Sequence, residues 1–145
     1  MVSGPGALQL QLQLTYELIP RNAPLFAEEI AVQGRERGIN LDYSADSIGY
    51  FDSVITSLRA QSVTVEQVAE VLLGFGCYLG EAVVRATGGS WVSSLGTPLE
   101  KLAPLPMVVT LPSGEVCDPA GRPFAALTKG SRSTLVSFYE EYAAR

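Results

Sequence analysis

The feature that most constrains the fold is an apolar run with three glycines, "VLLGFGCYLGEAVV", at residues 71–84. The run lies inside a longer segment that Thr64 opens and the pair Gly88 and Gly89 closes. Thr64 with Gln67 three residues later is the capping-box pattern of a helix N-terminus, and glycine commonly follows the end of a helix. The sequence therefore predicts one long helix with glycines in its interior.

Interior glycines destabilise a helix, so these positions need a compensating interaction. Each glycine costs roughly 1 kcal/mol relative to alanine. Close approach of another element is a plausible compensation, because a position without a side chain can be packed against directly. Gly76 and Gly80 are four residues apart and share one face, where another helix or a strand can enter. We therefore expect close packing at Gly74, Gly76 and Gly80.

Two other interpretations of the glycine run fail on its context. The spacing misses the dinucleotide-binding fingerprint by one residue, and that fingerprint needs a preceding strand with the glycines opening the helix. No lysine follows as it does in a phosphate-binding loop. The apolar stretch at 71–79 is about half the length of a membrane span, and Glu70 and Glu81 bracket it. The sequence thus predicts a buried helix without nucleotide or membrane contact.

Two further helices are predicted before this one. The segment at 22–38, "NAPLFAEEIAVQGRERG", has a proline in its first turn and a glycine at its end. Its predicted apolar side consists of Leu25, Phe26, Ile30 and Val32. Ser44 is a typical N-cap for the next helix. Apolar residues recur there at three- and four-residue spacing, at Ile48, Phe51, Ile55 and Leu58.

The second half of the chain has a different pattern. "SWV", "MVVTL" and "EVCDP" are strand candidates, and the turn "PSG" joins the last two as a hairpin in which Asp118 is a turn residue. "AGRPFAALTKG" then leads to a last helix, "SRSTLVSFYEEYAAR", which we expect Ser131 or Ser133 to cap. Helices, a small antiparallel sheet and a closing helix define an α+β fold. We expect residues 21–145 to form its single domain.

Residues 1–20 are predicted to be an N-terminal extension or an edge strand. "ALQLQLQL" alternates apolar and polar residues with the period of a strand, and such a strand can add to the edge of a partner's sheet. The segment lacks the basic start and the continuous apolar core of a signal peptide. We therefore expect a cytoplasmic protein that pairs with another protein through this strand, or with a second copy of itself.

The absence of histidine excludes many reactions. It removes Ser–His–Asp and Cys–His catalysis and most zinc and non-haem iron sites, so we expect neither a metal nor a cofactor. The net charge of −5 and a sparse basic grouping of Arg122, Lys129 and Arg132 argue against nucleic-acid binding. Cys77 and Cys117 are interpreted as free thiols, with a disulfide between them as the alternative.

One cluster of candidate site residues lies just after the glycine face. Tyr78, Glu81 and Arg85 follow along the long helix, and Trp91 comes soon after its end. One hypothesis is a small polar pocket in which Glu81 has a raised pKa and acts as a base. The other is a structural role, in which Glu81 pairs with Arg85 and Trp91 fills the edge of the core. Two further candidates precede the second helix, Asp42 and Tyr43.

Four short motifs occur in a familiar order. They are "LDYS" at 41–44, "YLGE" at 78–81, "GGSW" at 88–91 and "STLVSFYEEY" near the end. In this order the chain resembles a group of small bacterial domains of unknown function, over roughly residues 27–142. The resemblance implies a fold and brings no reaction or cofactor with it. Some similar small acidic bacterial domains are immunity or accessory proteins.

The sequence favours a non-catalytic bacterial protein-interaction domain of the immunity, regulatory or accessory kind. The missing histidine, the acidic charge and the N-terminal strand pattern support this expectation, and acidic charge favours a basic partner. The alternative is a small ligand-binding protein or a histidine-independent enzyme. Its pocket would use the side chains of Tyr78, Glu81, Arg85 and Trp91.

Overall fold

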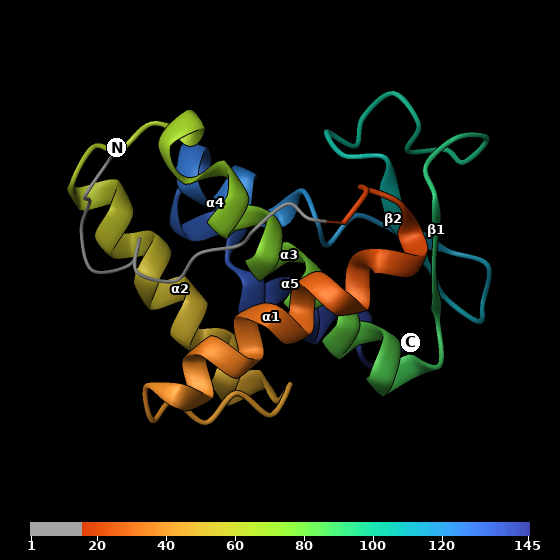
Figure 1. The fold of residues 1–145 in the computed structure, drawn as a ribbon. Helices are drawn as coiled ribbons and strands as arrows, with labels where there is room; N and C mark the ends of the chain where they lie inside the picture. The colour runs from red at the N-terminus through yellow and green to blue at the C-terminus, as the bar shows by residue number, and fades with distance from the viewer. Residues whose placement is uncertain (1–15) are drawn as a thin grey trace.

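The glycine-containing helix α3 (Val65–Thr87) lies at the centre of the fold in a computed structural model that describes residues 16–145, apart from the Ser131 side chain (Figure 1). Thr64 and Gln67 form the expected capping box, with Thr64 Oγ1 accepting from the Gln67 N–H at 3.3 Å. Gly88 follows the helix in the left-handed region, at φ 81°. Every residue of 71–80 is buried, so the prediction of a buried central helix is confirmed.

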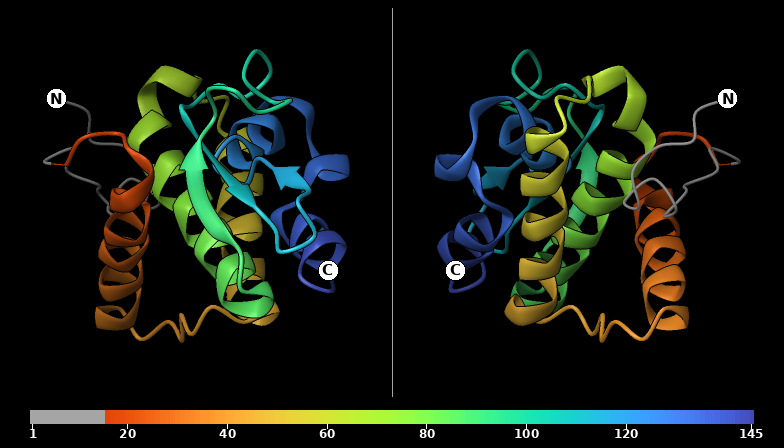
Figure 2. Two further views of the ribbon diagram at one scale, coloured as in Figure 1. Left: turned by 90° about the vertical axis from the view of Figure 1, so that its right-hand side faces the viewer. Right: turned by 90° about the vertical axis from the view of Figure 1, so that its left-hand side faces the viewer.

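The other elements surround α3 and complete an α+β fold. Figure 2 shows α1 on one side of α3 and the pair α4 and α5 on the other, and α3 contacts all three helices. The second helix, α2, packs on α4 and α5. In chain order the elements are η2 (Pro20–Asn22), α1 (Ala23–Glu36), α2 (Ala45–Ala60), α3, β1 (Ser90–Ser93), β2 (Met107–Thr110), β3 (Val116–Cys117), α4 (Arg122–Lys129), η3 (Ser131–Ser133) and α5 (Leu135–Tyr142).

The strands form one small antiparallel sheet in the order β1-β2-β3. Trp91 lies opposite Val109, which in turn lies opposite Cys117. The central strand β2 is buried along Met107, Val108 and Val109. The predicted hairpin of β2 and β3 is therefore confirmed. Among residues 16–145 no strand pairs with the outer edge of β1, and η2 contacts this strand.

Close packing at the glycines of α3 is confirmed, although the three positions face different neighbours. A Cβ atom on Gly76 would lie 2.6 Å from the carbonyl oxygen of Ala120, in the turn before α4. A Cβ on Gly80 would overlap the indole ring of Trp91 in β1, and one on Gly74 would overlap the side chain of Ile30 in α1. The glycines thus let α1, β1 and the turn before α4 approach the backbone of α3 from two sides.

The apolar side predicted for the first helix is partly wrong. Leu25 and Val32 are 44% and 41% exposed, whereas the buried positions of α1 include Phe26 and Ile30. Leu25 and Val32 are seven residues apart and so lie on the same, outer side of the helix. Alanines at positions 23, 27 and 31 complete the buried face instead, because small side chains let α1 lie close to α3.

Two predictions near the C-terminus also need correction. "AGRPFAALTKG" contains a helix of its own, α4, with a proline in its first turn. The last helix, α5, is capped by neither Ser131 nor Ser133 but by Thr134, whose side chain accepts from the Ser137 N–H. Asp52 of α2 adds a second cap, because its two carboxylate oxygens accept from the first two backbone N–H groups of α5 at 2.8 and 3.0 Å. The predicted N-terminal strand lies outside the described residues.

The helix α3 is also long and apolar enough to satisfy a length and composition criterion for a membrane span. However, 72% of its most apolar window is buried inside the protein. Core helices satisfy the same criterion, so it is weak support for a span.

We predict that Gly76→Ala destabilises the protein by about 1–3 kcal/mol, because the new methyl group meets the Ala120 backbone, which cannot rotate away. Gly49→Ala is the matched control in α2. Its nearest neighbour would be a Val136 methyl group at an ordinary 3.8 Å, so alanine should be neutral or stabilise by up to about 1 kcal/mol. Urea denaturation of both variants measures the difference. Equal stability of the two variants would contradict the packing described here.

Candidate functional site

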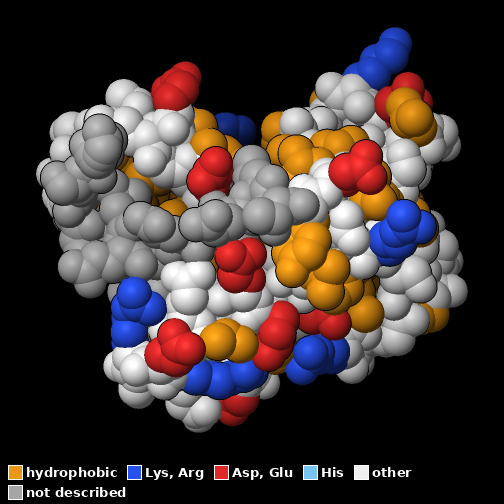
Figure 3. All heavy atoms as spheres, viewed as in Figure 1, with side chains coloured by type: hydrophobic (Ala, Val, Ile, Leu, Met, Phe, Trp, Pro, Cys, Tyr) orange, Lys and Arg blue, Asp and Glu red, His pale blue; other side chains and the backbone are white. Residues whose placement is uncertain are grey.

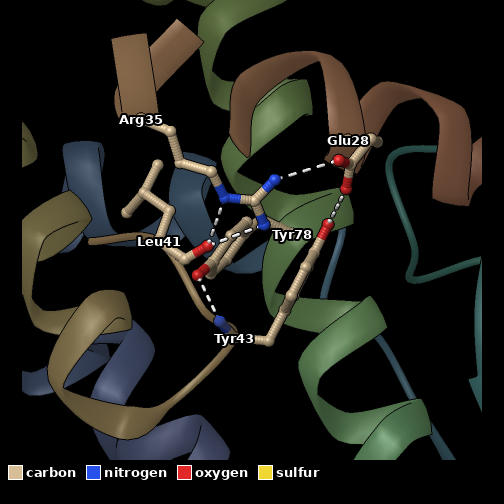
Figure 4. Close-up of polar contacts among 5 residues, drawn as sticks. All are labelled: Glu28, Arg35, Leu41, Tyr43 and Tyr78. Atoms are coloured by element: carbon tan, nitrogen blue, oxygen red, sulfur yellow. Dashed lines mark hydrogen bonds and ion pairs between the residues drawn. The ribbon is translucent and has the colours of Figure 1, made fainter. Parts of the chain in front are cut away.

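Tyr43 is the centre of a polar and aromatic network between α1, α2 and α3. Its backbone has φ 65°, in the left-handed region that bulky side chains rarely adopt. Three contacts hold it there. Its N–H donates to Tyr78 Oη at 2.7 Å, its ring stacks on the Tyr78 ring at 4.3 Å, and its hydroxyl donates to Glu28 Oε1 at 3.0 Å. Side chains of α1 and α3 therefore hold Tyr43 in this strained conformation, as Figure 4 shows.

Arg35 of α1 fixes the same loop from the other end. Its Nε and Nη2 atoms donate to the carbonyl oxygen of Leu41 at 3.1 and 2.8 Å, and Nη1 pairs with Glu28 Oε2 at 3.1 Å (Figure 4). Glu28 therefore links the arginine to the hydroxyl of Tyr43. The loop between α1 and α2 is held by side chains of α1 and α3 on both sides of Asp42.

The second half of the network lies along the last turns of α3. The guanidinium carbon of Arg85 lies 3.8 Å from the centre of the Tyr43 ring, a cation–π contact. Arg85 Nε also reaches Glu81 Oε2 at 3.5 Å, and the indole N–H of Trp91 donates to Glu81 Oε1 at 3.4 Å. The Glu81 side chain is only 13% exposed, whereas that of Arg85 is 55% exposed. Glu81 thus has a partner at each oxygen.

The structure brings five of the six candidate residues together and separates the sixth. Asp42 is exposed, and its Oδ1 atom accepts from the Ser44 N–H at 3.1 Å. The hydrogen bonds from Ser44 hold the pKa of Asp42 below its ordinary value. Asp42 therefore stabilises the start of α2. The residues that lie together are Tyr43, Tyr78, Glu81, Arg85 and Trp91.

The chemistry of this network favours the structural hypothesis. Burial raises the pKa of both tyrosine hydroxyls, so they stay protonated and serve as hydrogen-bonding groups. Tyr78 Oη accepts from the Tyr43 N–H and also bonds to Ser47 Oγ at 2.6 Å. The glutamates of the network are engaged by arginine, tyrosine or tryptophan donors. The network therefore braces the loop before α2 against α3.

Sequence reasoning missed Glu28 and Arg35, which lie seven residues apart on one side of α1. Their opposite charges at that spacing were a usable signal for a shared face. The carbonyl of Leu41, to which Arg35 donates, leaves no signal in the sequence because backbone acceptors belong to every residue. Their importance therefore emerges only from the fold.

A second feature that the sequence did not reveal is a cavity of about 290 Å³ beside β3, α4 and α5. Arg122 is fixed at its edge, donating to Thr134 O at 3.1 Å and to Ser137 Oγ at 3.0 Å. Asp118 Oδ1 accepts from the Gly121 N–H at 3.0 Å. The lining residues are Leu99, Val116, Cys117, Asp118, Gly121, Arg122, Ala125, Phe138 and Tyr142.

The third feature is the connection between β1 and β2, at residues 94–106, which projects from one end of the fold (Figures 1 and 2). It exposes Leu95 by 72% and Leu102 by 76%. Its own hydrogen bonds organise it: Thr97 N–H donates to Ser94 O, and Gly96 N–H donates to Glu100 Oε1. The loop is thus an ordered support for two exposed leucines.

Cys77 and Cys117 are both buried free thiols, and burial raises the pKa of each to about 12. Residues 16–145 contain no group of three acidic, cysteine or histidine side chains placed to hold a metal ion. Comparison with protein-family models, curated proteins and solved structures found no match to the chain.

We predict that Tyr78→Phe destabilises the protein by about 1–3 kcal/mol, because the buried Tyr43 N–H loses its acceptor. Tyr50→Phe is the control, since Tyr50 is half-buried and its hydroxyl makes no hydrogen bond within residues 16–145. That change should alter the free energy of unfolding by less than about 0.5 kcal/mol. Thermal or urea unfolding measures both. A Tyr78→Phe protein as stable as the control would mean that the network does not brace the loop.

A further prediction concerns pH. Burial raises the pKa of Asp118 above its ordinary 3.8, so the charged carboxylate destabilises the folded state at neutral pH. This cost disappears as the pH falls below the unfolded value, because the group is then neutral in both states. Asp118→Asn should therefore raise the free energy of unfolding at pH 7, and the gain should shrink towards zero near about pH 3.

Urea denaturation across this pH range measures the gain. Asp46→Asn in the exposed first turn of α2 is the control, because a negative charge at that place is favourable and its removal should give no gain. A gain for Asp118→Asn that stayed constant with pH would contradict the role of charge.

Proposed function

We propose that this chain is a non-catalytic protein-interaction domain and that the loop at residues 94–106 makes the contact. The supporting observation is the exposure of Leu95 and Leu102, which exceeds that of every other large apolar side chain among residues 16–145. Exposed apolar side chains that gather on one ordered segment are typical of an interaction surface. The loop at residues 94–106 therefore supplies the apolar anchors of the interface.

The ordered backbone of the loop supports the same proposal. The Ser94 N–H donates to Pro106 O and so joins the two ends of the loop, and the Ala103 N–H donates to Leu99 O and closes a turn within it. The prolines at positions 98, 104 and 106 further limit its conformations. A loop that is already ordered loses less conformational entropy when a partner binds.

The identity of the partner is part of the proposal. The acidic balance of the chain, with a net charge of −5, favours a basic protein through electrostatic steering. An immunity, regulatory or accessory role in the cytoplasm of a bacterium fits a small domain with this kind of surface. A second copy of the chain is the other partner that the test below distinguishes.

The test places a photo-crosslinking amino acid at position 95 or 102 in the cell of origin, with position 61 as the control. Gln61 is exposed and directly follows α2, and Figure 1 shows α2 and the loop between β1 and β2 on opposite sides of the fold. We expect one discrete adduct from positions 95 and 102 and none from position 61. The double variant Leu95→Ser with Leu102→Ser should keep its thermal stability and weaken the association by roughly tenfold or more.

The mass of the adduct shows whether the partner is a second copy or another protein. Identical adduct patterns at all three positions would refute the assignment of the loop as the interface. A loss of thermal stability in the double variant would show that the leucines belong to the core.

A further inference from the structure

The cavity described above adjoins the proposed interface. Leu99, which lies between Leu95 and Leu102 in the loop, is also one of the residues that line the cavity. The remaining walls come from β3, from the turn before α4 and from α4 and α5. The loop that carries the two exposed leucines therefore borders the cavity of about 290 Å³ through Leu99.

Asp118 brings to this cavity a carboxylate that forms no ion pair within residues 16–145. Its Oδ1 atom accepts from the Gly121 N–H, whereas Oδ2 has no hydrogen-bond partner among residues 16–145. No lysine or arginine of those residues lies within 4.0 Å of the carboxylate, although Arg122 lines the same cavity. A partly buried carboxylate without a counter-charge is unfavourable, so a cation that enters the cavity gains a partner.

The aromatic walls suit an organic cation. The rings of Phe138 and Tyr142 lie 4.7 Å apart at an angle of 46°, and both border the cavity. Each ring already has a guanidinium of this chain near it, since Arg122 lies 5.5 Å from Phe138 and Arg145 lies 5.2 Å from Tyr142. Guanidinium groups bind aromatic rings through cation–π contacts, and these two intramolecular contacts are examples of that chemistry at the same rings.

The two arginines nearby already have contacts within the chain. Arg145 binds Glu115 at 2.6 Å and reaches Glu141 at 3.8 Å. Arg122 is fixed by Thr134, Ser137 and the Phe138 ring. Asp118 Oδ2 is thus a carboxylate oxygen at this cavity that has no hydrogen-bond partner within residues 16–145. The described residues hold no set of three potential metal ligands, which favours an organic cation over a metal ion.

We propose that this cavity receives the basic side chain, arginine or lysine, of the partner segment that docks on the loop at residues 94–106. The proposal rests on the proposed function, because that function places a partner segment next to the cavity. The basic side chain pairs with Asp118 Oδ2 and lies against the aromatic rings, while apolar residues of the same segment cover the leucines of the loop. Specificity for a basic residue then comes from the cavity.

The experiment titrates the ¹⁵N-labelled full chain with N-acetyl-arginine amide and follows the backbone amide signals by NMR. N-acetyl-citrulline amide, which has the same shape without the charge, is the matched neutral probe. We expect saturable shifts at Asp118, Arg122, Phe138 and Tyr142 with the arginine probe. Binding of the citrulline probe should be weaker by about tenfold or more.

Asp118→Asn should weaken binding of the arginine probe by a similar factor. Asparagine keeps an acceptor for the Gly121 N–H, so the turn before α4 is retained. Asp46→Asn removes one exposed carboxylate elsewhere and should leave the binding unchanged. Equal binding of the two probes, equal binding by Asp118→Asn and the unchanged chain, or no saturable shift at these amides would each overturn the proposal.

The proposed interface at the loop and the proposed binding of a basic side chain in the cavity can be refuted independently. The double variant Leu95→Ser with Leu102→Ser should still bind the arginine probe, because neither leucine lines the cavity. If the loop gives no specific crosslink, the interface is wrong even though the cavity binds the probe. If the loop gives a crosslink and the probe does not bind at Asp118, the cavity does not receive a basic side chain, whereas the loop remains the interface.

Discussion

The close approach of the turn before α4 to the central helix is the contact on which the rest of the structure depends. Gly76 lets the backbone of Ala120 lie against α3, and one turn further on Gly80 makes room for the ring of Trp91. The first contact fixes the start of α4, and the second fixes the sheet at β1. Interior glycines cost roughly 1 kcal/mol each in helix stability, and these two contacts explain why the helix keeps them.

The same contact positions the two surfaces proposed for binding. Ala120 lies two residues after Asp118, so holding Ala120 against α3 also holds the turn that points Asp118 at the cavity. Trp91 holds β1, and the loop at residues 94–106 begins directly after that strand. Binding groups function best when rigid elements support them. The central helix thus supports the cavity and the loop through one line of glycines.

Local signals in the sequence were sufficient for the starts of α2 and α3 and for the hairpin, because caps and turns involve residues close in the chain. Ser44 and Thr64 cap their helices as predicted. The cap of α5 could not be predicted in full, since Asp52 reaches it from α2 across more than eighty residues. The left-handed backbone of Tyr43 likewise depends on Tyr78. The exposure of Leu95 could not be predicted from the sequence either, because a leucine in a proline-containing connection gives the same sequence pattern whether it is buried or exposed.

The candidate residues on α3 and the residues of the cavity differ in whether they leave polar atoms without a hydrogen-bond partner. At the end of α3, Glu81 has donors at both oxygens, and the ring of Tyr43 lies between Tyr78 and Arg85. A ligand there would have to break contacts that hold a strained loop, and the loss would offset the gain. At the cavity, Asp118 has one oxygen without a partner in the described chain, so a cation there adds a contact to that oxygen. Binding is therefore favoured where the fold leaves a polar group unsatisfied, which is at β3 and α4 and not along the glycine helix itself.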